Sequence, residues 1–132
     1  MKKIKQVERS DAIILTLPVA FFNDRGMSTD QFKVLFERYM QRDDALWNFR
    51  LTNLPTFDVN YVYLVFAGHV QYRANLVQYE RNKTKRFADA PDGKTRTFPN
   101  CNWVLFTGPI IKPPQPIPMR GFQGFRYSLI IF

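Results

Sequence analysis

Residues 60–68 constrain the fold of this chain most strongly, because they have the composition of a strand that is apolar on both faces. The run Tyr-Val-Tyr-Leu-Val-Phe at 61–66 is rich in aromatic and β-branched residues, which favour strands. A run with no polar face is typical of a strand covered on both sides, in the middle of a sheet. Gly68 ends or bends it. From Val70 to Leu76 apolar and polar residues alternate, which indicates a half-exposed strand. We therefore expect two strands joined at Gly68, or one long strand kinked there.

Further strands are predicted at both ends of the chain. Residues 12–17 form a short apolar run that Pro18 ends, residues 102–107 form another, and residues 125–132 are expected to form the last strand. Residues 21–26 are predicted to turn, with Gly26 as the breaker. Residues 43–59 have no clear periodicity and contain Pro55, which predicts a loop. Residues 80–99 are basic and include the turn signal Pro91-Asp92-Gly93, so they are expected to form a loop or a hairpin.

One convincing helix begins after Ser28. Ser28 and Gln31 have the spacing of a capping box, in which each side chain satisfies the other residue's backbone N–H. The residues that follow place apolar side chains on one helical face at the spacing i, i+3, i+4, i+7, i+8. We expect this face to pack against the sheet; its members are Phe32, Leu35, Phe36, Tyr39 and Met40.

Residues 108–118 are unsuited to a helix or a central strand, because four of the six residues from 113 to 118 are prolines. They predict an extended crossing pinned to the body by its isoleucines. Strands thus outnumber helices. The 132 residues fit one domain, 1–132, with residues 1–11 as a loose basic arm. The predicted fold is mainly β (α+β): a small, partly open barrel with one main helix packed on it.

Charge and composition narrow the function. A formal net charge of +8 suits anionic partners, of which nucleic acid is the first candidate, although the same charge also serves solubility alone. His69 and Cys101 are the sole histidine and cysteine, so no metal site and no cofactor are expected, and an internal disulfide is excluded. The apolar run at 12–22 is too short and interrupted to span a bilayer, and the N-terminus lacks a signal cleavage site. The expected setting is cytoplasmic, with no membrane partner.

Residues 119–127 combine two arginines, two glycines, a glutamine and three aromatics. We expect this stretch to line a polar and aromatic ligand cleft as it turns into the last strand, because arginines and aromatics offer flat faces for stacking a base. In that reading Phe122 and Phe125 help to sandwich the base, and the Gln123 amide reads its edge. The plainer alternative is a tight hairpin with core phenylalanines and solvated arginines.

Other residues extend the predicted site. Trp47 either anchors its loop or provides a stacking platform, and arginines beside aromatics can both pair with phosphate and stack. The basic residues near Lys83 either hold phosphates or form a solvated loop. The full set of predicted nucleic-acid-binding residues is Trp47, Arg50, Arg73, Lys83, Lys85, Arg86, Arg120, Phe122, Gln123, Phe125 and Arg126.

The block at 61–74 resembles the strand pair of PUA-like domains, including the ASCH and EVE branches, and residues 102–109 and 121–127 resemble their closing strands. The resemblance implies a PUA-like pseudo-barrel that binds RNA or DNA, often at a modified base. The Gly-Lys-Glu-Arg type motif that marks many ASCH domains is missing, which leaves the branch open.

The expected function is therefore that of a non-catalytic nucleic-acid-binding domain, with recognition of a modified or flipped base in an arginine and aromatic cleft as its more specific form. One alternative is a protein-interaction module of a mobile-element or defence system, with a protein partner. The other is a small nucleoside-directed hydrolase, for which Cys101, His69 and an aspartate are the conceivable catalytic set. A free cysteine near a strand start is more often a small buried hydrophobe.

Overall fold

The computed structural model describes residues 10–88 and 93–132, so most of the predicted arm, residues 1–9, and part of the predicted turn at 91–93 lie outside the described residues. The fold is mainly β. In chain order its elements are β1 (Ala12–Thr16), α2 (Val19–Asp24), α3 (Thr29–Met40), β2 (Trp47–Leu51), β3 (Tyr61–Phe66), β4 (His69–Ala88), β5 (Thr95–Ile111) and β6 (Phe125–Ser128).

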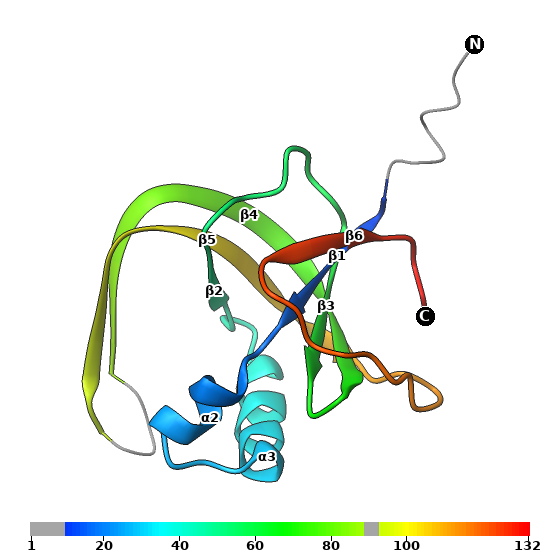
Figure 1. Cartoon of the computed structure of the whole chain (residues 1–132), viewed down its shortest axis with the longest axis horizontal. Helices are drawn as coiled ribbons and strands as arrows, with labels where there is room; N and C mark the ends of the chain where they lie inside the picture. Colours follow the sequence, from blue (N-terminus) through cyan, green and yellow to red (C-terminus); the bar gives the residue numbers. More distant parts are fainter. Residues whose placement is uncertain (1–9, 89–92) are drawn as a thin grey trace.

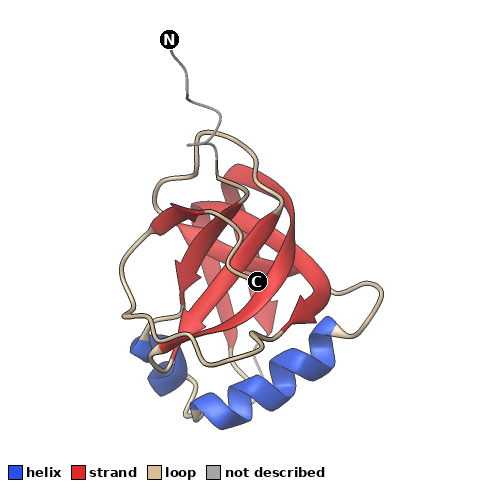
Figure 2. Ribbon diagram, turned by 90° about the vertical axis from the view of Figure 1, so that its right-hand side faces the viewer, coloured by secondary structure: helices blue, strands red, loops and turns tan. Residues whose placement is uncertain are grey.

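The strands form one mixed, strongly curved sheet that is not closed (Figure 1). Its order is β2-β5-β4-β3-β1-β6, so β2 and β6 are the two edges. β1 pairs parallel to β3, with Ala12 opposite Tyr61, and the other neighbours are antiparallel. Both helices lie at one end of the sheet (Figure 2). β4 and β5 form a long hairpin whose far end returns towards α2.

The central position predicted for residues 60–68 is confirmed, since β3 lies between β4 and β1. Its alternate side chains enter two separate cores. Val62, Leu64 and Phe66 join the larger core under the helices, whereas Tyr63 and Val65 join a smaller core on the other face. Both cores explain why the run has no polar side. The join at Gly68 is also confirmed, because β3 ends at Phe66 and β4 begins at His69.

The predicted helix is confirmed together with its cap. The Ser28 hydroxyl accepts from the Gln31 N–H, and the Gln31 side chain accepts from the Ser28 N–H. Phe32 and Phe36 are buried as expected, but Leu35 is 42% exposed and does not belong to the core. The sheet touches a narrower stripe of the helix than the spacing suggested.

The turn predicted at residues 21–26 is wrong in part, because α2 occupies most of it. Phe22 is buried and meets Phe32 of α3 edge-on at 5.5 Å between ring centroids, and Phe21 meets the same ring at 5.4 Å. This aromatic packing stabilises a short helix that no periodic pattern announced. Gly26, with φ +59°, ends it as a breaker.

Pairing with β5 overrides local signals at two predicted boundaries and decides between the alternatives at a third. Residues 47–51 form the edge strand β2 rather than a loop. Residues 81–88 and 95–98 are hairpin strands, which decides between the predicted loop and hairpin. β5 continues through Pro109 to Ile111, and only residues 112–118 form the irregular crossing. The last strand is shorter than expected, since β6 ends at Ser128.

β5 can run past the end of α3 only because residue 108 is a glycine. A Cβ at Gly108 would lie 2.5 Å from the main-chain oxygen of Met40, and a backbone atom cannot move aside cheaply. The close approach fixes the helix against the sheet. No helix within residues 10–88 and 93–132 is long and apolar enough to cross a membrane.

Candidate functional site

A cleft of about 640 Å³ runs along the free edge of β2. We call it the β2 cleft. It lies between α2 on one side and the far end of the β4–β5 hairpin on the other. Five consecutive residues from 46 to 50 line it, as expected if the ligand space follows a strand edge. The complete lining is Leu17, Pro18, Ala20, Phe21, Asp24, Arg25, Tyr39, Leu46, Trp47, Asn48, Phe49, Arg50, Phe87, Ala88, Arg96, Phe98 and Trp103.

β2 is paired on one side only, so every second residue turns its backbone N–H and C=O away from β5. Just before the strand, Leu46 uses both groups on one partner: the Tyr39 hydroxyl donates to its carbonyl and accepts from its N–H, each at 3.0 Å. Tyr39 therefore occupies the backbone hydrogen-bonding groups of the residue just before β2. Among the described residues no other strand pairs with this edge, which runs along the cleft.

The walls of the cleft are rich in aromatic rings. Trp47 is half-buried and meets Phe36 edge-on at 5.1 Å, so it is anchored to the core and also faces the cleft. These contacts agree with the predicted anchoring role, and its role as a stacking platform stays a prediction. On the hairpin side Phe87, Phe98 and Trp103 form a cluster with centroid distances of 5.7 to 6.2 Å. Trp103 is only 2% exposed and supports the two phenylalanines from behind.

Three arginines border these rings. The Arg50 guanidinium lies 4.6 Å from the centroid of Phe98, and that of Arg25 lies 3.9 Å from the centroid of Phe21. Arg25 also donates to the Phe21 carbonyl at 3.1 Å. Arg96 of the hairpin donates to the main-chain oxygen of Asp24 at 3.2 Å and so links the hairpin to α2. Each arginine is thus in contact with a ring or tethered by a hydrogen bond.

A polar chain positions one further cleft residue, Asn48. The Lys85 ammonium lies 2.6 Å from Glu80 Oε1 and donates to Asn48 Oδ1 at 2.7 Å. The hydrogen bond from Lys85 lowers the pKa of the Glu80 carboxyl, against the opposing effect of burial, so this group is anionic near neutral pH. Gln78 donates to its other oxygen at 3.1 Å. Lys85 belongs to the predicted set, but it acts here from behind the cleft lining.

The stretch at 119–127 does not line the β2 cleft. Phe122 packs against the smaller core under the Arg126 guanidinium, 4.1 Å from its centroid, and Phe125 packs against the larger core. Arg120 and Gln123 are exposed. The Phe122 N–H donates to Thr16 Oγ1 at 3.3 Å, so this part of the stretch lies beside the last residue of β1, next in sequence to Leu17 of the cleft lining. Of the residues predicted to stack or pair with a ligand, the structure places Trp47 and Arg50 in the cleft and these five outside it.

The other predicted residues have structural or surface positions. Arg73 lies 4.4 Å from the Tyr61 ring centroid and donates to the main-chain oxygen of Phe132, which holds the C-terminal segment to the sheet. The Lys83 carbonyl accepts from the Trp103 indole at 2.9 Å. The side chains of Lys83 and Arg86 are exposed on the hairpin.

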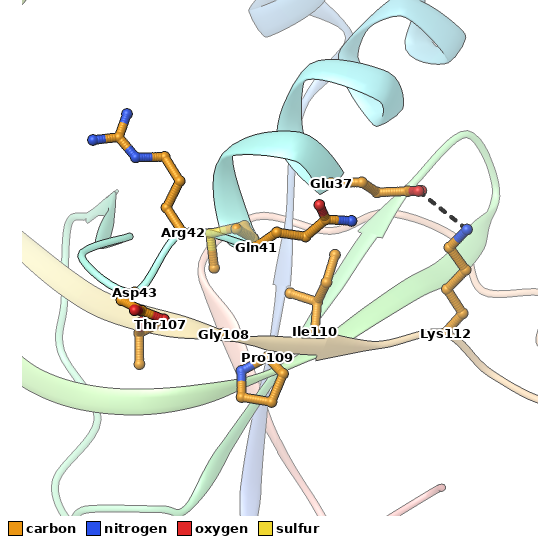
Figure 3. A pocket seen from close by; sticks show the side chains of 10 residues that line it. Glu37, Gln41, Arg42, Asp43, Thr107, Gly108, Pro109, Ile110 and Lys112 are labelled. Carbon is orange, nitrogen blue, oxygen red and sulfur yellow. Dashed lines mark ion pairs between the residues drawn. The ribbon is translucent and has the colours of Figure 1, made fainter.

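A second hollow of about 540 Å³ lies where α3 ends above β5 (Figure 3). Glu37 and Lys112 meet on one side of it at 3.1 Å. Burial opposes ionisation of Glu37, but hydrogen bonds from Tyr72 and Lys112 outweigh it and lower the pKa of this carboxyl. The lining contains no aromatic ring and carries both signs of charge, with Arg42 and Asp43 opposite this pair. It lacks the stacking surfaces that distinguish the β2 cleft.

The conceivable catalytic pair is not assembled. His69 begins β4, whereas Cys101 of β5 pairs with Lys83 near the other end of β4. The Cys101 thiol donates a hydrogen bond to the Pro99 carbonyl, and the His69 ring is hydrogen-bonded to the Ala67 carbonyl. Among the described residues no three His, Cys, Asp or Glu side chains gather to hold a metal ion.

Sequence reasoning missed most of the cleft lining. The sequence predicts a turn at Phe21 and Arg25, whereas the helix that forms there places residues four apart on one face. Phe87 and Phe98 lie in the segment 80–99, for which the sequence predicts only a basic loop or hairpin. Their signal was alternation: Lys85, Phe87, Arg96 and Phe98 are the half-buried residues of a hairpin whose intervening side chains are exposed.

No protein-family model, curated protein or solved structure matches the chain. The chemistry of the β2 cleft is therefore the guide to what the protein binds. Flat rings, fixed guanidinium groups and an open strand edge are brought together in one hollow. Such a site can stack a planar ligand, pair with an anion and exchange backbone hydrogen bonds.

Proposed function

We propose that the protein is a non-catalytic nucleic-acid-binding domain that takes an unstacked base into the β2 cleft. The observation that carries the proposal is the placement of Arg50 and Arg25 on phenylalanine rings at the two walls of one 640 Å³ hollow. That volume lies in the range of roughly 300–1,000 Å³ usual for small-ligand sites. The curved, open sheet with a helix at one end is consistent with the PUA-like pseudo-barrel proposed from the sequence.

A base offers what the aromatic walls require. Stacking of a base on an aromatic side chain contributes about 1–3 kcal/mol and tolerates any sequence, because every base has a π face. Trp47 and Phe98 present such rings, and Trp47 is already fixed by its contacts with α3. Little side-chain freedom would be lost on binding, which favours affinity.

The charge distribution suits the backbone attached to that base. Arg50 and Arg96 flank the cleft, and the adjoining hairpin exposes Arg81, Lys83 and Arg86. Phosphates that follow the hairpin would meet a positive surface, and the net charge of +8 adds a sequence-independent attraction. A base can enter the cleft only from a single strand or after leaving a duplex stack.

Fluorescence anisotropy with a labelled single-stranded oligonucleotide tests the proposal. We expect tighter binding of the single strand than of the matching duplex, with an affinity that falls steeply as salt rises. Trp47 and Trp103 both line the cleft, but Trp103 is 2% exposed and Trp47 is the more accessible ring. Binding should therefore quench tryptophan emission, and Trp47→Phe should abolish most of the quenching. No binding at low salt, or affinity insensitive to salt, would contradict the proposal. The latter result would favour a protein-interaction module.

A further inference from the structure

The β2 cleft contains one side chain whose hydrogen-bonding direction is already decided. Asn48 lies on β2 and lines the cleft, while Lys85, which holds it, is not among the lining residues. An asparagine amide offers an acceptor oxygen at one end and two donor hydrogens at the other. Which end faces a ligand determines which bases it can recognise.

Lys85 fixes this orientation. An ammonium group can only donate, so the atom of Asn48 at 2.7 Å from it has to be the oxygen. Lys85 is held in turn by the Glu80 carboxylate at 2.6 Å, and Gln78 secures Glu80. This chain of contacts opposes rotation of the amide. The Asn48 nitrogen has no hydrogen-bond partner among residues 10–88 and 93–132, and it is the end left for the cleft.

The arginines of the lining have the same character, whereas Asp24 supplies an acceptor. Arg25 and Arg50 are donors without acceptor capacity, and they border the same hollow. A base that turns a carbonyl oxygen towards Asn48 meets a donor, whereas a base that turns an amino group there leaves two donors opposed. An unpaired buried donor is costly, so the mismatch discriminates more than the match attracts.

We propose that Asn48 makes the β2 cleft selective for keto bases, uracil or thymine and guanine, over the amino bases cytosine and adenine. This inference rests on the proposed function. Uracil and cytosine provide the sharpest comparison, because they have nearly the same size and stacking area. With position 4 turned towards Asn48, uracil presents a carbonyl and cytosine an amino group, and the adjacent N3 is a donor in uracil and an acceptor in cytosine. Lys85 and Glu80 are positioning residues for this selection.

The test compares short oligomers of uridine and cytidine, equal in length, by anisotropy at one salt concentration. We expect the wild type to bind oligouridine about fivefold more tightly, the equivalent of one net hydrogen bond. Asn48→Ala should remove the preference. Asn48→Asp keeps the shape and the contact with Lys85 but presents an acceptor, so the preference should reverse in favour of cytidine. Lys85→Met frees the amide to rotate and should also remove the preference.

A ratio of two affinities separates this inference from the proposed function and from loss of charge. If every oligomer binds but uridine and cytidine bind equally, or if Asn48→Asp leaves the ratio unchanged, the role of Asn48 is refuted while base binding stands. If no oligomer binds, both proposals fail. Thermal melts verify that each variant folds. The same pair as DNA, thymidine against deoxycytidine, shows whether the selection depends on the sugar.

Discussion

Arg50 and Arg126 form a natural matched pair for locating the binding site. Each is an exposed arginine on an edge strand, and each places its guanidinium on a phenylalanine, at 4.6 Å from Phe98 and 4.1 Å from Phe122. Replacing either by alanine removes one positive charge and uncovers one ring. They differ in that Arg50 lines the β2 cleft and Arg126 does not. The two variants therefore separate a local contact from a general electrostatic effect.

The expected size follows from the geometry at Arg50. A hydrogen bond to a charged group has a net value of about 1.5–3 kcal/mol, and exposure to solvent places this one at the low end. Arg50→Ala should weaken binding of a single-stranded oligonucleotide about tenfold. The slope of log affinity against log salt should fall by about 0.7, the value for one phosphate contact on a single strand.

Arg126→Ala should change the affinity by no more than about threefold, because it removes only long-range attraction that salt screens. Arg50→Lys should keep the salt slope yet lose affinity, since an ammonium cannot stack flat on Phe98. Anisotropy titrations at several salt concentrations give both quantities. Equal losses for the two alanine variants would refute a localised cleft contact. A larger loss for Arg126→Ala would move the site to the stretch at 119–127.

Three further predictions concern the cleft wall and the scaffold. Phe98→Leu should weaken oligonucleotide binding by about 1–3 kcal/mol through lost stacking. Phe57→Leu disrupts the 4.6 Å stack on Tyr127, away from the cleft, and should leave binding unchanged in the same assay. Equal effects of the two changes would contradict a stacking role for Phe98. Gly108→Ala should destabilise the fold by about 1–3 kcal/mol in chemical denaturation, because its Cβ would lie 2.5 Å from the Met40 oxygen; an unchanged midpoint would show that α3 and β5 are not so close. Because the pKa of Glu37 is lowered, its ionised form stabilises the fold above the ordinary pKa of a carboxyl, and this contribution is lost as pH falls through the lowered value. Glu37→Gln should therefore lose less stability on acidification than the wild type. Identical pH profiles of the free energy of unfolding would count against the Tyr72 and Lys112 contacts.

The sequence was informative where one local pattern and the tertiary contacts agree. Three local patterns each predict an element that the structure contains. They are the strand at 61–66 that is apolar on both faces, the alternating strand after Gly68 and the helix that begins with the capping box at Ser28. The short strand at 47–51 shows the opposite case. It forms because β5 offers a partner more than fifty residues away, which no local pattern reports.

The candidate site shows the same division. The pattern of arginines beside aromatic residues predicts Trp47 and Arg50 as site residues, and both line the cleft. The same pattern predicts residues 119–127, and none of these lines it. Phe122 and Phe125 are needed to cover two cores at the end of the sheet. The cleft instead joins α2, β2 and the hairpin, three segments whose proximity depends on how far the long strands curve, and curvature is not encoded in a local pattern.

Ultraviolet cross-linking of a bound single-stranded oligonucleotide, followed by mass spectrometry of the cross-linked peptides, tests most directly whether the β2 cleft holds the base. Binding of a base in the β2 cleft should give adducts on the aromatic residues Phe21, Trp47 and Phe98, and these should be lost on competition with unlabelled single strand. Adducts confined to residues 119–132, with none on those three rings, would contradict it.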